Sequence, residues 1–132
     1  MLKITRKVEY ALIALRHLQQ IEQGHLASAK LMASSYGIPQ ELLAKIMQKL
    51  AKEKIVQAIK GPKGGYKLCK DPNSINMTKF FEIMEGPMGI MDCYFDSNCE
   101  QLKGCTIREP INRINNSIRS MFDNMTLADI TF

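Results

Sequence analysis

The sequence has few of the residues from which active sites are usually built. Its 132 residues include only two histidines, and neither belongs to a nucleophile–histidine–acid set. It contains no glycine-rich phosphate-binding loop of the nucleotide-hydrolysing type, no internal repeat and no low-complexity segment. These absences argue against an enzyme and against a small-molecule substrate.

Long apolar runs are also lacking. No segment approaches the ~18 consecutive apolar residues that span a bilayer, so we expect no membrane partner. The N-terminal stretch has basic residues before apolar ones, but Glu9 and Arg16 interrupt it and no small-residue cleavage site follows. We therefore expect a cytoplasmic protein in a reducing compartment, where structural disulfides are rare.

Acidic residues are scarce in the first half of the chain. Residues 1–70 carry 13 Lys/Arg against 4 Asp/Glu, a balance of +9, whereas residues 71–132 carry 5 against 9, a balance of −4. A basic half on a small protein is typical of a surface that binds the phosphate backbone of nucleic acid. An ordinary lysine-rich solvated face fits the charge alone equally well.

Three helical patterns occupy most of that basic half. Apolar residues recur at helical spacing over 5–20, Ser28 can cap a shorter helix that ends at Tyr36 before Gly37, and a third helix opens at Pro39. The predicted buried stripe of the third helix is Leu42, Leu43, Ile46, Met47 and Leu50. Two helices joined by a tight turn follow the helix-turn-helix plan, in which the second helix enters the major groove. A plain helical hairpin is the alternative.

A β-hairpin signature follows these helices. Apolar alternation leads into a glycine-rich turn at Gly61–Gly65, and the second strand is predicted to end at Asp71–Pro72. Cys69 in that strand is predicted to be a buried, small apolar residue. Three helices with a basic hairpin make a winged helix-turn-helix, which we predict over residues 1–76.

Residues 77–132 form the second predicted unit. Met77–Glu85 has the pattern of a fourth helix, and from Thr106 apolar residues recur at three- and four-residue steps in an amphipathic helix of roughly 25 Å. We predict a dimerisation helix, with packing on its own core as the alternative. Residues 126–130 are expected to add a last helical turn. The predicted fold class is mainly α with a small β-hairpin wing and a long C-terminal dimerisation helix.

Cys93, Cys99 and Cys105 recur every six residues in a stretch with no helical or strand period. Thiolates placed so close together are stable as ligands of a metal ion or iron–sulfur cluster, or as disulfides. Structural zinc sites favour more closely spaced ligand pairs, and the cysteine spacings of ferredoxins are absent. The residues by themselves leave a cluster, zinc and a metal-free thiol switch open.

Several segments together have a family likeness. They are MLKITRKVEYAL, YGIPQELLAKIMQKL, KGPKGGYKL followed by KDP, the cysteine triplet, and NMTLADI. Over nearly the whole chain these segments resemble the bacterial iron–sulfur winged-helix regulators that include IscR, NsrR and RirA. The resemblance implies a homodimer that binds a double-stranded DNA operator and carries an iron–sulfur cluster on Cys93, Cys99 and Cys105.

The resemblance also bears on the fourth ligand of the cluster. IscR uses a histidine a few residues past the third cysteine, where this chain has Arg108. In NsrR-type members a carboxylate from the first helix of the partner subunit can serve, and Glu9 falls at the matching position. Glu9 is therefore the implied fourth ligand, which favours [4Fe-4S] over [2Fe-2S]; an ion pair with Arg6 is the alternative role.

The expected function is that of a cluster-sensing transcriptional repressor that responds to nitric oxide, redox state or iron and cluster supply. A zinc- or thiol-based redox-switch regulator and a metal-binding structural protein without DNA function are the alternatives. The residues expected at DNA are Pro39, Gln40, Glu41, Lys45 and Lys49 of the third helix, and Lys60, Gly61, Lys63 and Gly64 of the wing.

Overall fold

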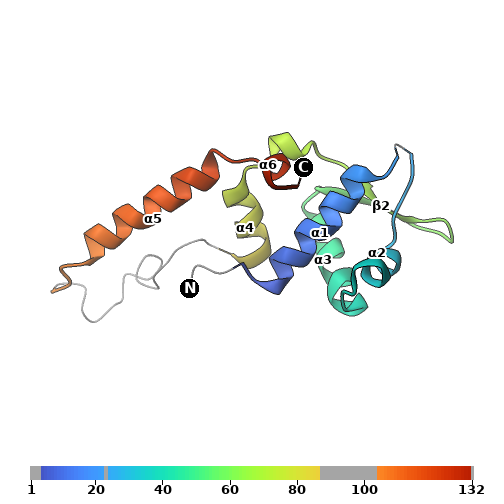
Figure 1. The fold of residues 1–132 in the computed structure, drawn as a ribbon, viewed down its shortest axis with the longest axis horizontal. Helices are drawn as coiled ribbons and strands as arrows, with labels where there is room; N and C mark the ends of the chain where they lie inside the picture. The colour runs from blue at the N-terminus through green and yellow to red at the C-terminus, as the bar shows by residue number, and fades with distance from the viewer. Residues whose placement is uncertain (1–3, 23, 87–103, 132) are drawn as a thin grey trace.

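The computed structural model describes residues 4–22, 24–86 and 104–131, and it confirms the predicted fold class (Figure 1). Its elements are α1 (Arg6–Gln20), α2 (Ala29–Tyr36), α3 (Gln40–Lys52), β1 (Val56–Ile59), β2 (Gly65–Leu68), the 3₁₀ helix η1 (Pro72–Ser74), α4 (Met77–Glu85), α5 (Arg108–Asp123) and α6 (Leu127–Thr131). No helix in these ranges is both long and apolar enough to cross a bilayer.

Polar caps determine where the helices begin. The Thr5 hydroxyl accepts a hydrogen bond from the Val8 amide, and Ser28 and Asn76 cap α2 and α4 in the same way. Pro39 is the cap of α3 rather than its first helical residue, a difference of one position. The helix boundaries therefore agree with the predicted ones within about two residues, which is the usual fraying of helix ends.

The core lies where α1, α3 and α4 pack together. Its largest fully buried side chains include Leu15, Met32, Leu43, Ile46, Met47, Leu50, Met77, Phe80 and Met84. Four of the five residues predicted for the buried stripe of α3 are buried, while Leu42 is half-buried at its edge. The 3.6-residue helical period thus identified the correct face of α3.

The wing is a two-stranded antiparallel hairpin, paired from Val56 opposite Leu68 to Ile59 opposite Gly65. The prediction that the second strand continues to Asp71–Pro72 is wrong. Asp71 accepts a hydrogen bond from the Asn73 amide and caps η1, which turns the chain away from the sheet. The prediction that Cys69 is buried is wrong too, because this residue lies past the last strand pair and its side chain is exposed.

The chain leaves α3 through a residue in the left-handed conformation. Lys54 has φ 62°. The amide of the next residue, Ile55, donates to the Leu50 carbonyl over 3.0 Å, as in a Schellman motif. A left-handed lysine costs about 1 kcal/mol, and glycine avoids this cost.

We therefore expect Lys54→Gly to raise the free energy of unfolding by about 0.5 kcal/mol, after allowance for the greater freedom of glycine in the unfolded chain. Thermal or urea denaturation measures the change. Lys52→Gly, at the last helical residue of α3, is the matched control and should lower stability by about 0.5–1 kcal/mol. Destabilisation by both substitutions would contradict the explanation.

The C-terminal end of the chain packs back on the helical body. The Met77 amide donates to the Met125 carbonyl over 2.9 Å, and the Leu127 amide donates to the Ile75 carbonyl over 2.8 Å. Leu127 and Ala128 of α6 are buried. Consequently α6 belongs to the same packed body as the first four helices, whereas α5 extends away from it (Figure 1).

Candidate nucleic-acid interface and cysteine segment

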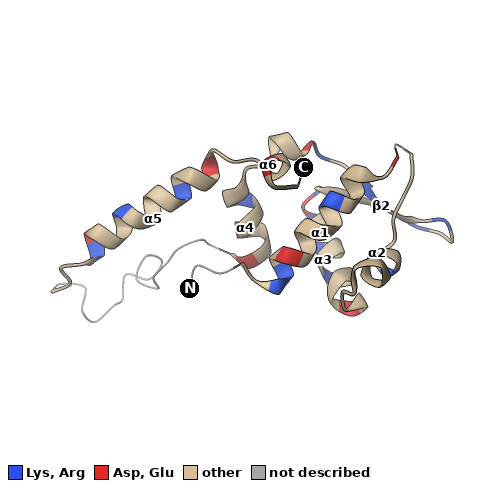
Figure 2. Cartoon of the chain, in the orientation of Figure 1, with Lys and Arg blue, Asp and Glu red and all other residues tan. Residues whose placement is uncertain are grey.

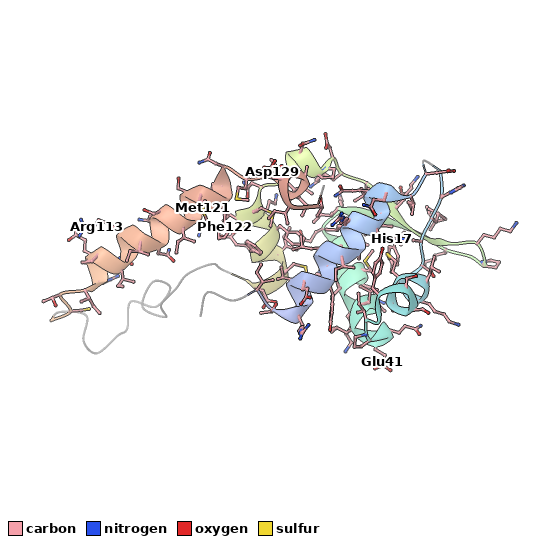
Figure 3. The ribbon with its side chains drawn as sticks, viewed as in Figure 1. His17, Glu41, Arg113, Met121, Phe122 and Asp129 are labelled. Atoms are coloured by element: carbon pink, nitrogen blue, oxygen red, sulfur yellow. The ribbon has the colours of Figure 1, made fainter. Side chains whose placement is uncertain are left out.

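The first turns of α3 present the predicted recognition residues to solvent. Gln40, Glu41 and Lys45 are exposed, and Lys49 is half-buried. Pro39, Gln40 and Glu41 line one shallow surface hollow together with Ala44. Figure 3 shows Glu41 at the outer edge of the molecule, away from α4. Amide and carboxylate side chains in this position have the hydrogen-bonding groups that base edges in the major groove require.

The tip of the wing carries the second set of predicted residues. Lys60, Gly61 and Lys63 are exposed and Gly64 is half-buried. The Gly64 amide donates to the Gly61 carbonyl over 2.9 Å, which closes the turn. In Figure 2 the ribbon of the wing is blue at its Lys positions, and residues 56–68 include no acidic residue. Such a tip suits contact with the phosphate backbone.

Backbone pairing joins the wing to the start of α2. The Ala27 amide donates to the Tyr66 carbonyl over 3.1 Å, and the Tyr66 amide donates to the Ala27 carbonyl over 2.8 Å. A β-carbon added at Gly65 would lie 2.8 Å from the Ala27 carbonyl carbon, so only glycine fits this crossing. Lys63 lines a surface hollow with His17, His25 and Leu31 among others. This bridge was not predicted from the sequence; Gly65 indicates a close approach of two backbones but not which segment approaches.

We expect Lys63→Ala to weaken binding to all DNA sequences alike. Loss of one phosphate contact should reduce the slope of log K against log salt by about 0.9. Fluorescence anisotropy at several salt concentrations measures the slope for unrelated duplexes. Lys79→Ala, on the exposed side of α4, is the control and should leave the slope unchanged. A loss confined to one DNA sequence would contradict a backbone role for Lys63.

The predicted metal ligands lie only in part within the described residues. Cys93 and Cys99 lie outside them; Cys105 is half-buried, three residues before the start of α5. Nowhere in the described ranges do three or more Cys, His, Asp or Glu side chains gather as a metal site would require.

Glu9 lies on the exposed side of α1 and is paired with Arg6. Its carboxylate is 3.4 Å from the Arg6 guanidinium, and 48% of its side chain is exposed. In a single chain Glu9 is therefore not buried at the edge of the apolar stripe of α1. Exposed ion pairs contribute about 0–1 kcal/mol, so the pair with Arg6 holds this carboxylate only weakly. A carboxylate so placed is chemically suited to ligate iron supplied by another subunit.

A polar contact links α1 to the end of α4. The Thr5 hydroxyl donates to the Glu85 carboxylate, although these residues are 80 positions apart in the sequence. Glu85 is the last residue of α4, and the cysteine-bearing segment follows it. The start of α1 and the C-terminal end of α4 are therefore adjacent in space.

The three-helix body, the exposed first turn of α3 and the basic wing define a winged helix-turn-helix DNA-binding protein. The family model of Rrf2, described as an iron-dependent transcriptional regulator, matches residues 4–132, and the chain belongs to this family. It is accordingly a DNA-binding transcriptional regulator and not an enzyme.

Relatives agree with this assignment. A protein of Aquifex aeolicus (strain VF5) named as an HTH-type transcriptional regulator is 29% identical over 126 residues, which cover 93% of this chain and 87% of that protein. CymR of B. subtilis, the global cysteine regulator, superposes with a TM-score of 0.76 at 26% identity, covering 99% of this chain and 97% of that one. IscR of T. potens shares the fold with a TM-score of 0.71 at 24% identity, covering 97% and 85%.

Proposed function

We propose that this regulator is a homodimeric repressor that senses its signal through an iron–sulfur cluster. The observation that carries the proposal is the position of the cysteine triplet in the connection between α4 and α5 of an Rrf2-family chain. Cys93, Cys99 and Cys105 would hold the cluster, with Glu9 of the partner subunit as fourth ligand. A [4Fe-4S] cluster suits this set of four ligands. Its iron sites would react with nitric oxide or oxidants, and iron shortage would prevent its assembly.

An exposed apolar edge on α5 supports the homodimer. Ile107, Ile114 and Met121 are 55%, 50% and 53% exposed and lie seven residues apart. With the half-buried Ile111 and Ile118 they form a heptad-like stripe, the pattern by which helices pair across an interface. An apolar stripe of this kind is unfavourable in water, and a second copy of the same helix would cover it.

In the proposed complex α3 and the wing contact different parts of the DNA. In our proposal α3 enters the major groove, where Gln40 and Glu41 meet base edges and Lys45 and Lys49 meet bases or phosphates. The wing then lies along the backbone through Lys60, Gly61, Lys63 and Gly64. In a homodimer the two α3 helices would bind successive half-sites of one operator.

Contacts within this chain connect the end of α4, which precedes the cysteine triplet in the sequence, with the DNA-binding body. Thr5 joins the start of α1 to Glu85 at the end of α4, and Glu9 lies one turn further along α1. The buried face of α1 packs in the same core as α3. A change at Glu9 or Glu85 can therefore alter the position of α3, which is the physical requirement for coupling between two sites.

Anaerobic purification followed by iron and sulfide analysis tests the cluster. We expect a brown protein whose visible absorbance and labile sulfide are lost in Cys99→Ala. Cys69→Ala is the matched control, since Cys69 is exposed and lies in the wing region rather than in the triplet; it should retain the cluster. A colourless protein that contains zinc would instead establish the zinc alternative.

Operator binding tests the sensing role. The cluster-bound and cluster-free dimers should differ in affinity for an operator selected from a random DNA pool, because only a difference in affinity allows the cluster to regulate. Equal affinities would remove the sensing role and leave a constitutive repressor. The absence of any DNA binding at low salt would favour a structural metal protein.

A further inference from the structure

Among the described residues, the hydrogen bond, ion pair and ring contact that join α5 to α4 lie near the C-terminal end of α5. Arg119 of α5 forms an ion pair with Glu82 of α4 over 2.7 Å, and the Thr78 hydroxyl donates to the Arg119 carbonyl over 3.3 Å. Phe122 packs edge-on against Phe81 with ring centroids 5.1 Å apart. We call these five residues the α4–α5 clamp. Phe122 lies on α5 at the end nearest the body (Figure 3).

The N-terminal half of α5 extends away from the other helices (Figure 1). Ile107, Arg113 and Ile114 are exposed there, whereas the three contacts with α4 named above involve Arg119 and Phe122. A helix fixed at one end can tilt about its attachment. The direction of α5 therefore depends on the clamp.

We propose that the α4–α5 clamp sets the distance between the two recognition helices of the dimer, so that Glu82 and Arg119 are positioning residues that select the half-site spacing of the operator. The inference rests on the proposed homodimer and its binding to two half-sites. It adds a determinant of DNA specificity that lies outside both α3 and the wing.

The chemistry of the clamp suits an angular constraint. An apolar contact such as Phe81–Phe122 tolerates small rotations at little cost. The Arg119–Glu82 pair is directional and only 35% and 33% exposed, so water screens it less than a pair on the open surface. The Thr78 hydroxyl, which is buried, fixes the same residue through its backbone. Together these contacts hold α5 in one direction.

A small tilt of α5 displaces its far end by a distance comparable to the rise of one base pair. The 16 residues of α5 span about 24 Å at 1.5 Å per residue. A tilt of about 8° would displace the far end by about 3.4 Å, which is the rise of one base pair. One added base pair also rotates a half-site by about 34° around the duplex. A clamp that limits tilting therefore makes the dimer sensitive to spacing at single-base-pair resolution.

The test measures affinity against spacing with the full-length dimer. The probe is an operator selected from a random DNA pool by the wild-type protein, remade with its half-sites moved by one and two base pairs in each direction. We expect the wild-type dimer to lose at least tenfold in affinity for a one-base-pair change. Glu82→Gln should reduce this discrimination to less than threefold while affinity for an isolated half-site stays unchanged.

Two further variants separate positioning from folding. Lys79→Gln, at an exposed residue of α4 outside the clamp, is the matched control and should keep the wild-type spacing profile. The charge-swapped double variant, Glu82→Arg with Arg119→Glu, should restore part of the discrimination.

A Glu82→Gln dimer with the wild-type profile, or with an equal loss at every spacing, would overturn the inference while leaving the proposed function intact. A wild-type protein that is monomeric, or that selects no DNA, would refute the proposed function and this inference with it.

Discussion

The Gly65→Ala variant is expected to lose DNA affinity for all sequences by at least roughly tenfold, because the wing can no longer lie against the start of α2. An added β-carbon would lie 2.8 Å from the Ala27 carbonyl carbon and 2.9 Å from its oxygen. Both atoms are backbone and cannot swing aside. The two hydrogen bonds between Ala27 and Tyr66 should break, at a cost of about 2 kcal/mol.

Two measurements follow the loss of this bridge. The melting temperature should fall by roughly 5–10 °C, and the amides of Ala27 and Tyr66 should lose their protection from hydrogen exchange. Gly104→Ala is the matched control, since a β-carbon there meets no atom of the described residues within 4 Å. The cluster-free form of this variant should bind DNA as the cluster-free wild type does. Wild-type affinity and melting temperature in Gly65→Ala would contradict the bridge.

The Ile114→Glu variant is expected to be a folded monomer with greatly weakened operator binding. Ile114 is half-exposed in a single chain, so a carboxylate there is solvated and the body should keep its stability. In a dimer the same carboxylate would be buried against the apolar stripe of the second α5. Loss of the second half-site should lower operator affinity by at least about 100-fold.

Sedimentation velocity and operator titration measure these effects. Asn116→Glu is the control, because Asn116 is exposed on the opposite face of α5 and should leave the protein dimeric. A dimeric Ile114→Glu protein would show that α5 pairs through another face or does not mediate the dimer. An unfolded Ile114→Glu protein would instead indicate that α5 packs on its own body.

Local sequence signals predicted the helices of this fold well. Ser28 is a capping residue whose effect depends on a neighbour three positions away, and the apolar period of α3 selected its buried face. Such information is contained in a short window of sequence. For the same reason Gly37 was correctly placed at the left-handed end of α2.

Features that depend on distant partners escaped the sequence analysis. Cys69 was predicted to be buried from its residue type and the strand pattern, but the sheet ends before it. The pairing of Ala27 with Tyr66 joins positions 39 residues apart, and no local pattern specifies it. The predicted DNA contacts lie on exposed elements, but their contacts with DNA, like the ligand roles of the cysteines and Glu9, remain predictions.

The start of α4 and the residue that follows α5 lie side by side, and this arrangement has a consequence for how the sequence between them can change in related proteins. Met77 and Met125 are hydrogen-bonded through their backbones over 2.9 Å, so the chain between them is an excursion that begins and ends at one place, with α4 packed in the core and α5 extending outward. Changes in the outer part of the excursion, beyond the clamp, need not displace the ends that anchor it. One DNA-binding body can thus accept different outer segments, each joined to it at the same two neighbouring backbone positions.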